Sequence, residues 1–115
     1  MNARQMLRQA LELYRENDFP RAQMLLETLP MDDLESELQI EAHYLWGRVL
    51  VSRGEPLEAA THFQACLKLK PRYFPALDAW GNVLASMGDA RGAIEKYRRV
   101  LSIAPKQNHA HVLFN

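Results

Sequence analysis

The sequence predicts an all-α fold of antiparallel helix pairs that stack in one direction. The first observation behind this prediction is a repeated segment: "WGRVLVSRGE" at Trp46–Glu55 returns as "WGNVLASMGD" at Trp80–Asp89, 34 residues later. The second is that apolar residues recur at helical spacing, while no stretch alternates as a strand would. Self-similarity at this period is typical of repeat proteins, in which each helix pair buries its apolar face against the next.

The correspondence continues beyond this segment at the same offset and preserves small, aromatic and proline residues in order. The matched pairs are Gly47 and Gly81, Gly54 and Gly88, Ala59 and Ala93, Phe63 and Tyr97, Leu67 and Leu101, and Pro71 and Pro105. A weaker copy lies upstream, where Ala10 aligns with Gly47 at an offset of 37. We therefore expect one domain over 1–115, with units at about 3–36, 37–73 and 74–107 and a partial fourth unit at 108–115.

Within each unit the residues predict a helix, a turn and a second helix. The first helix of the chain is expected over about 3–16, where apolar residues keep helical spacing. Asn17, Gly54 and Gly88 then follow the first helices, and these residue types best tolerate the left-handed conformation that closes a helix.

Acidic residues come next, at Asp18, Glu55 and Asp89, where the dipole at the start of the second helix favours them. Pro71 prevents extension of the second helix in the middle unit. "DDLE" at Asp32–Glu35 resembles a capping box and predicts the start of the long first helix there.

Two glycines inside the first helices indicate close helix packing. Gly in a helix costs roughly 1 kcal/mol relative to Ala, so Gly47 and Gly81 need a structural reason. We expect Ala59 and Ala93 of the paired helices to lie opposite them. The bulky residues are then expected to fill the gaps between successive units; they are Trp46, Trp80, Phe63 and Tyr97.

Composition and charge exclude several classes of function. Lys plus Arg and Asp plus Glu number 14 each, so no overall field attracts nucleic acid or an anionic membrane. The apolar runs are too short for membrane insertion. The start lacks the apolar core of a secretory signal; a mitochondrial presequence is the alternative to a first amphipathic helix. A single cysteine, Cys66, excludes an intrachain disulfide and fits a reducing compartment, so we expect a cytoplasmic location.

The pattern resembles the tetratricopeptide repeat family. The residues that carry the resemblance are Trp46, Gly47, Leu50, Gly54, Ala59, Phe63, Cys66 and Pro71 in the second unit, and Trp80, Gly81, Leu84, Gly88, Ala93, Tyr97, Val100 and Pro105 in the third. The resemblance implies a right-handed superhelix whose concave face, lined by the first helix of each unit, binds peptides or proteins without catalysis.

Carried over residue by residue, the resemblance places Arg15, Val51, Ser52 and Ser86 on the concave face, together with nine residues that are expected to form the partner-binding groove. The nine are Arg4, Leu7, Leu11, Tyr14, Glu41, Tyr44, Arg48, Asp78 and Asn82, and a fourth unit adds His109 and Val112. An apolar or amphipathic segment would suit this surface, with Arg48 and Asn82 reaching its carboxylates or carbonyls. The alternative is that the leucines pack against a neighbouring helix and the tyrosines only cover the core.

A branch of the family binds acidic chaperone tails through a two-carboxylate clamp built from Lys, Asn and Arg. The corresponding positions here are Leu7, Leu11, Arg48, Asp78 and Asn82. Only two of them could serve, and Asp78 would repel a carboxylate. The sequence therefore argues against this ligand.

Other chemistry has little support in the sequence. His62 and Cys66 lie four residues apart, which is a permitted metal-ligand spacing, but no third ligand is near in sequence. Asp32 and Asp33 are interpreted as a helix start rather than as an acid and base pair. No phosphate-binding loop or nucleophile motif is present. We expect no catalytic residue, no metal site and no cofactor.

The last residues, "KQNHAHVLFN", begin another first helix. Either the chain is the N-terminal piece of a longer protein, or this segment leaves an apolar edge at Val112, Leu113 and Phe114 for formation of a homo-oligomer. The main hypothesis for function is a protein-binding adaptor or scaffold. The alternatives are a self-assembling structural repeat protein and the N-terminal targeting arm of a longer enzyme.

Overall fold

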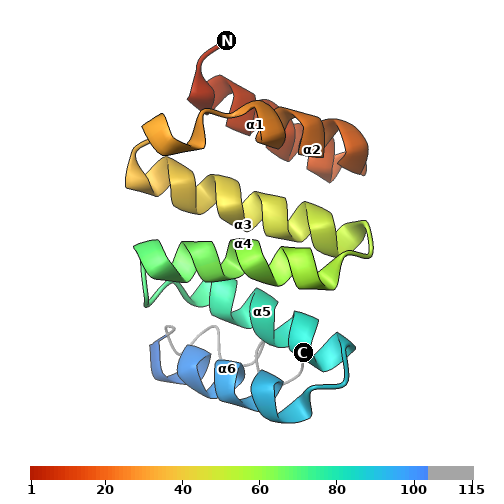
Figure 1. Ribbon diagram of the computed structural model, residues 1–115, viewed down its shortest axis with the longest axis vertical. Helices are drawn as coiled ribbons and strands as arrows, with labels where there is room; N and C mark the ends of the chain where they lie inside the picture. The colour runs from red at the N-terminus through yellow and green to blue at the C-terminus, as the bar shows by residue number, and fades with distance from the viewer. Residues whose placement is uncertain (104–115) are drawn as a thin grey trace.

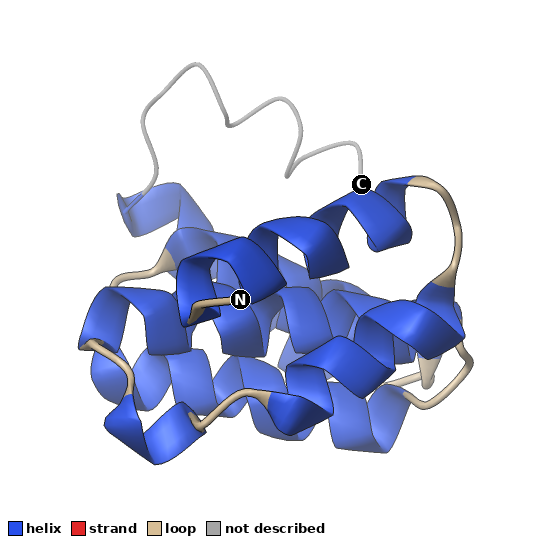
Figure 2. Ribbon diagram, turned by 90° about the horizontal axis from the view of Figure 1, so that it is seen from above, coloured by secondary structure: helices blue, strands red, loops and turns tan. Residues whose placement is uncertain are grey.

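The computed structural model describes residues 1–103, and these residues form α-helices and one short 3₁₀ turn, with no strand among them (Figure 2). The predicted all-α fold is therefore confirmed. The elements are α1 (Ala3–Arg15), α2 (Phe19–Thr28), η1 (Met31–Asp33), α3 (Ser36–Ser52), α4 (Pro56–Leu69), α5 (Phe74–Ser86) and α6 (Ala90–Ile103). The predicted partial fourth unit at 108–115, with His109, Val112, Leu113 and Phe114, lies outside the described residues.

Successive helices pack as antiparallel neighbours from α1 to α6, so the chain advances in one direction (Figure 1). The first helices of the pairs also touch one another, because α3 contacts both α1 and α5. They therefore form one continuous layer, and the second helices cover it. No helix among residues 1–103 combines the length and apolarity needed to cross a membrane.

The predicted turns close the first helix of every pair. Asn17, Gly54 and Gly88 have φ values of 64°, 76° and 84°, the left-handed region that glycine and asparagine tolerate best. The residue that follows then starts the second helix. Asp18 and Asp89 accept hydrogen bonds from backbone amides three residues on, whereas Glu55 makes no such side-chain bond.

The capping box predicted at Asp32–Glu35 is wrong. Residues Met31–Asp33 form the 3₁₀ turn instead, and α3 begins at Ser36 after Glu35, with no side-chain capping bond. A side chain of α3 stabilises this turn, because Nε2 of Gln39 donates a hydrogen bond of 2.7 Å to the carbonyl oxygen of Met31. That bond fixes the link between the first two helix pairs.

The core consists of overlapping apolar clusters rather than one central mass. One cluster joins α1 and α2 to one face of α3, a second joins α3, α4 and α5, and a third lies between α5 and α6. Trp46 packs against the first two clusters and Leu67 against the last two. The first two clusters therefore join neighbouring helix pairs, and the third holds the last pair together, as expected for a repeat protein.

The side chains nearest to the two glycines are aromatic rings, and that Ala59 and Ala93 also lie opposite the glycines stays a prediction. A Cβ atom on Gly47 would lie 2.7 Å from Cζ of Phe63, and one on Gly81 would lie 2.6 Å from Cε1 of Tyr97. Each ring therefore contacts the first helix of its own pair, and Phe63 also belongs to the cluster that includes Ala76 and Ala79 of α5. The small size of Gly47 and Gly81 lets each ring rest on the backbone of the first helix.

A polar pair interrupts the apolar contact between α3 and α4. The Nδ1 atoms of His43 and His62 lie 3.0 Å apart, so one imidazole donates a hydrogen bond to the other. Trp46 stacks on His62 with ring centroids 4.3 Å apart. Burial, and secondly the neighbouring His43, lowers the pKa of His62 from 6.5 to about 4, and burial also lowers the pKa of His43.

Replacing Gly47 with Leu should destabilise the fold by about 1–3 kcal/mol or more, because the new side chain must displace the Phe63 ring. Urea unfolding followed by circular dichroism measures the change. Ala85→Leu is the matched control, because Ala85 is also on the first helix of a pair but is exposed. Equal unfolding free energies for the two variants would contradict this packing.

Acidification should weaken the fold through the histidine pair. The folded pKa of His62 lies below its unfolded value, so its contribution to stability is complete above about pH 6.5 and is lost as pH falls towards 4. The unfolding free energy should therefore drop more between about pH 7.5 and about pH 5 in the parent than in His62→Gln. Parallel pH curves for the two proteins would show that His62 is not responsible.

Candidate functional site

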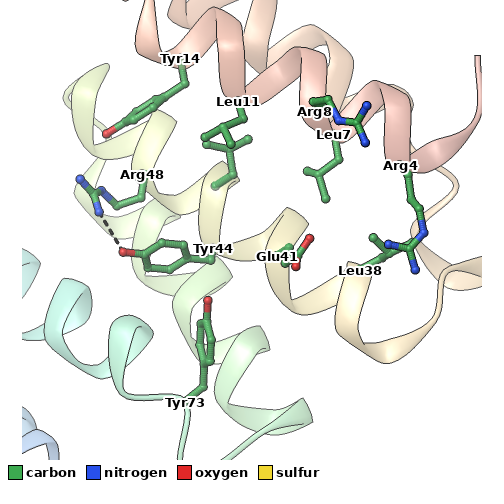
Figure 3. Close-up of a pocket in the computed structure, with 11 residues that line it drawn as sticks. Arg4, Leu7, Arg8, Leu11, Tyr14, Leu38, Glu41, Tyr44, Arg48 and Tyr73 are labelled. Carbon is green, nitrogen blue, oxygen red and sulfur yellow. Dashed lines mark hydrogen bonds between the residues drawn. The ribbon is translucent and has the colours of Figure 1, made fainter. Parts of the chain in front are cut away.

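Seven of the nine residues expected to form the partner-binding groove line one groove, which α1 and α3 form together with Tyr73 from the loop before α5 (Figure 3). Its volume is about 490 Å³. The lining residues are Arg4, Leu7, Arg8, Leu11, Tyr14, Leu38, Glu41, Tyr44, Leu45, Arg48 and Tyr73.

Helical spacing explains why the two helices present these side chains together. Leu7, Leu11 and Tyr14 follow one another at intervals of four and three residues on α1, so they share one face. On α3, Tyr44 and Arg48 have the same relation. A complete capping box between Asn2 and Gln5 fixes the start of α1, because each side chain bonds the other residue's backbone amide.

The guanidinium of Arg48 is held in place by two tyrosine rings at one end of the groove. Its central carbon lies 5.9 Å from the ring centroid of Tyr14 and 5.7 Å from that of Tyr44, both within cation–π range. Nη1 also donates a hydrogen bond of 2.8 Å to the Tyr44 hydroxyl. Arg48 nevertheless remains exposed. The groove thus holds an oriented cation that retains donors for a ligand.

Tyr73 belongs to the groove, although the sequence reasoning missed it. Its ring meets that of Tyr44 edge to face, with centroids 5.8 Å apart, and its hydroxyl end points into the groove (Figure 3). Burial, followed by the nearby Tyr44, raises the pKa of Tyr73 to about 12. The family resemblance assigns only positions on the first helices to the concave face, so it does not point to Tyr73, which lies in a loop. The available signal was an aromatic residue directly before a helix start.

The charges around the groove are mainly positive. Arg4 forms an ion pair of 3.1 Å with Glu35, but both side chains are about two-thirds exposed (65% and 68%), so the pair contributes little stability. Arg8, Arg48 and the carboxylate of Glu41 are also exposed. Arg8, Leu38 and Leu45 were further lining residues that the sequence reasoning did not include.

Asp78 and Asn82 do not line this groove. The Tyr97 hydroxyl of α6 donates a hydrogen bond to Oδ1 of Asn82. Burial, and secondly the charge of Asp78, raises the pKa of Tyr97. Both residues therefore interact with the second helix of their own pair. That Arg48 and Asn82 act together on one ligand stays a prediction.

The sequence-level metal candidates do not converge. Cys66 is fully buried, and its thiol donates to the carbonyl oxygen of Ile40 at 3.3 Å, whereas His62 faces His43. Across residues 1–103 no group of three or more His, Cys, Asp or Glu side chains could hold a metal ion. Asp32 and Asp33 lie in η1.

Solved structures identify the fold. No protein-family model matches the sequence, and no curated protein matches it. A structure from the functional characterisation of Pseudomonas aeruginosa pilF superposes with a TM-score of 0.81 at 19% identity, over 91% of this chain and 47% of that one. The C-terminal TPR-containing domain of a putative FK506-binding protein from Plasmodium falciparum superposes with a TM-score of 0.77 at 13% identity. The match covers 96% of this chain and 85% of that domain.

These similarities show that the chain has a tetratricopeptide repeat fold, a superhelix of stacked helix pairs. The predicted resemblance is confirmed at the level of the fold. The chain spans about half the length of the pilF structure.

The Cys66 thiol should resist modification in the folded protein. Burial raises its pKa to about 12, so the reactive thiolate is scarce at neutral pH. A colorimetric thiol reagent should label no cysteine in buffer and one per chain in denaturant, since the sequence holds one cysteine. Rapid labelling without denaturant would contradict the observed burial.

Proposed function

We propose that this chain is a non-catalytic protein-interaction module, an adaptor or scaffold that binds a peptide or protein segment in the groove between α1 and α3. The observation that carries the proposal is the exposed Arg48 guanidinium, oriented by Tyr14 and Tyr44 beside an apolar surface. Tyr and Arg are favoured anchors at protein interfaces, since they combine a large contact area with hydrogen-bonding capacity.

The residues around the groove also indicate the type of ligand. Leu7, Leu11 and the tyrosine rings would receive the apolar side chains of an amphipathic segment. Arg48 would bind a carboxylate of that segment, because a planar guanidinium can donate two parallel hydrogen bonds. Because its ring partners already hold it, Arg48 loses less conformational entropy on binding than a free arginine would.

The experiment is a selection of peptides from a random library on the full chain, followed by affinity measurements. Peptides that bind the groove should combine apolar or aromatic residues with at least one acidic residue. Arg48→Ala combined with Tyr44→Ala should weaken their binding by about tenfold or more, as expected for central anchors. Arg48→Lys should also weaken it, because the charge remains but the ring contacts and paired donors are lost.

Lys68→Ala is the matched control, because Lys68 is an exposed cation on α4 outside the groove. Circular dichroism must show that each variant folds. Sedimentation equilibrium should give the same oligomeric state for the parent and the groove variant. Unchanged peptide affinity in the folded double variant would rule out the groove as the binding site, and a changed oligomeric state would favour self-assembly instead.

A further inference from the structure

The outer face of α6 carries a concentration of arginine. The helix contains Arg91, Lys96, Arg98 and Arg99 but only one carboxylate, Glu95. Around the exposed Ile94, three of these cations and Glu95 border a shallow hollow of about 460 Å³. The chain as a whole has no net charge, so this basic surface is a local feature.

Comparison of α6 with the equivalent helix of the preceding unit, α4, indicates what this face of α6 can contact. Ile94 and Leu101 of α6 correspond, 34 residues earlier, to Ala60 and Leu67 of α4. On α4, both of these residues pack against the cluster that α3, α4 and α5 share, in which α5 contributes Ala76, Ala79 and Val83. The same stripe on α6 is therefore in the position that a further helix covers. Ile94 is 49% exposed.

Cations border this stripe where the earlier helix has neutral residues. Arg91 and Arg98 replace Leu57 and Gln64 of α4, and they lie seven residues apart on one side of the helix. Two helical turns separate them, roughly 10 Å along the helix axis. A helix that packs on Ile94 would therefore pass both guanidinium groups at its edge.

The arginines have no acidic partner in the part of the chain that the structure describes. The carboxylate of Glu95 pairs with Lys96 at 3.2 Å, and the same Lys96 lies 4.1 Å from the ring centroid of Trp80. Within residues 1–103, Arg91, Arg98 and Arg99 make no ion pair. Their charge is therefore available to a ligand.

We propose that the outer face of α6 binds an acidic amphipathic helix of a partner protein. Apolar residues of that helix pack on Ile94 and on the part of Leu101 that the α5–α6 cluster leaves uncovered, and carboxylates spaced by two turns reach Arg91 and Arg98. Residues 104–115, "APKQNHAHVLFN", contain no Asp or Glu, so that segment offers no acidic side chain to these arginines. Charge complementarity thus favours a partner chain over this segment as the occupant.

The test uses a fluorescent synthetic peptide, a helix with one leucine stripe flanked by glutamates, and a matched peptide with lysine at each glutamate. The full chain should bind the glutamate peptide and not the lysine peptide, and the binding should weaken with salt. Arg91→Glu combined with Arg98→Glu should reduce the affinity at least about tenfold, and Ile94→Ala should reduce it several-fold. Fluorescence anisotropy measures each dissociation constant.

Arg53→Glu combined with Lys68→Glu is the matched control, because it changes the net charge equally at exposed sites away from α6. An equal loss of peptide affinity in the control and in the α6 variant would overturn the proposal, since binding would then follow net charge alone. A loss of affinity in Arg48→Ala but not in the α6 variant would also overturn it, because the peptide would then bind in the groove. Binding only after Leu113→Glu and Phe114→Glu would make the chain's own last residues the occupant.

Discussion

The packing of an aromatic ring of one helix on a glycine of the paired helix sets the geometry of this protein. Phe63 rests on Gly47 and Tyr97 rests on Gly81, and in both places a Cβ atom would lie closer to the ring than atoms normally approach. The two helices of a pair can therefore pack closely, because the ring of one helix lies directly on the backbone of the other. Because this contact recurs in the second and third pairs, both have the same internal arrangement, and similar units can stack regularly.

The same contact supports the groove. Phe63 is fully buried, and its ring lies 6.0 Å from that of Tyr44, which in turn meets Tyr73 and bonds Arg48. A continuous series of ring contacts thus runs from the core of the α3–α4 pair to the exposed guanidinium. The position of Arg48 depends on this series, because each ring limits the rotamers of the next. The surface of the groove is in this sense an extension of the core.

The sequence predicted those features that depend on a single residue or on a repeated period. Left-handed turns at Gly54 and Gly88 follow from glycine itself, and the shared face of Leu7 and Leu11 follows from the helical period. The sequence did not predict the features that depend on a particular tertiary contact. Asn82 stays a predicted concave-face residue, but the bond that its side chain accepts from Tyr97 appears only in the folded chain. Tyr73 lies in a loop, where no period applies, so only the folded chain brings it to Tyr44.

A chain with no net charge can still carry cationic surfaces, because several acidic residues do not pair with those cations. Asp32, Asp33 and Glu37 lie at the junction of η1 and α3, where Glu35 pairs with Arg4 of the groove. The structure is about 40 Å long, whereas salt screens exposed charges beyond about 8–10 Å. Arg48 in the groove and Arg98 on α6 would therefore act locally, on single carboxylates that reach them. The proposed ligands, short acidic and apolar segments, suit such surfaces better than a polyanion, whose affinity grows with the number of phosphates neutralised along a continuous basic track.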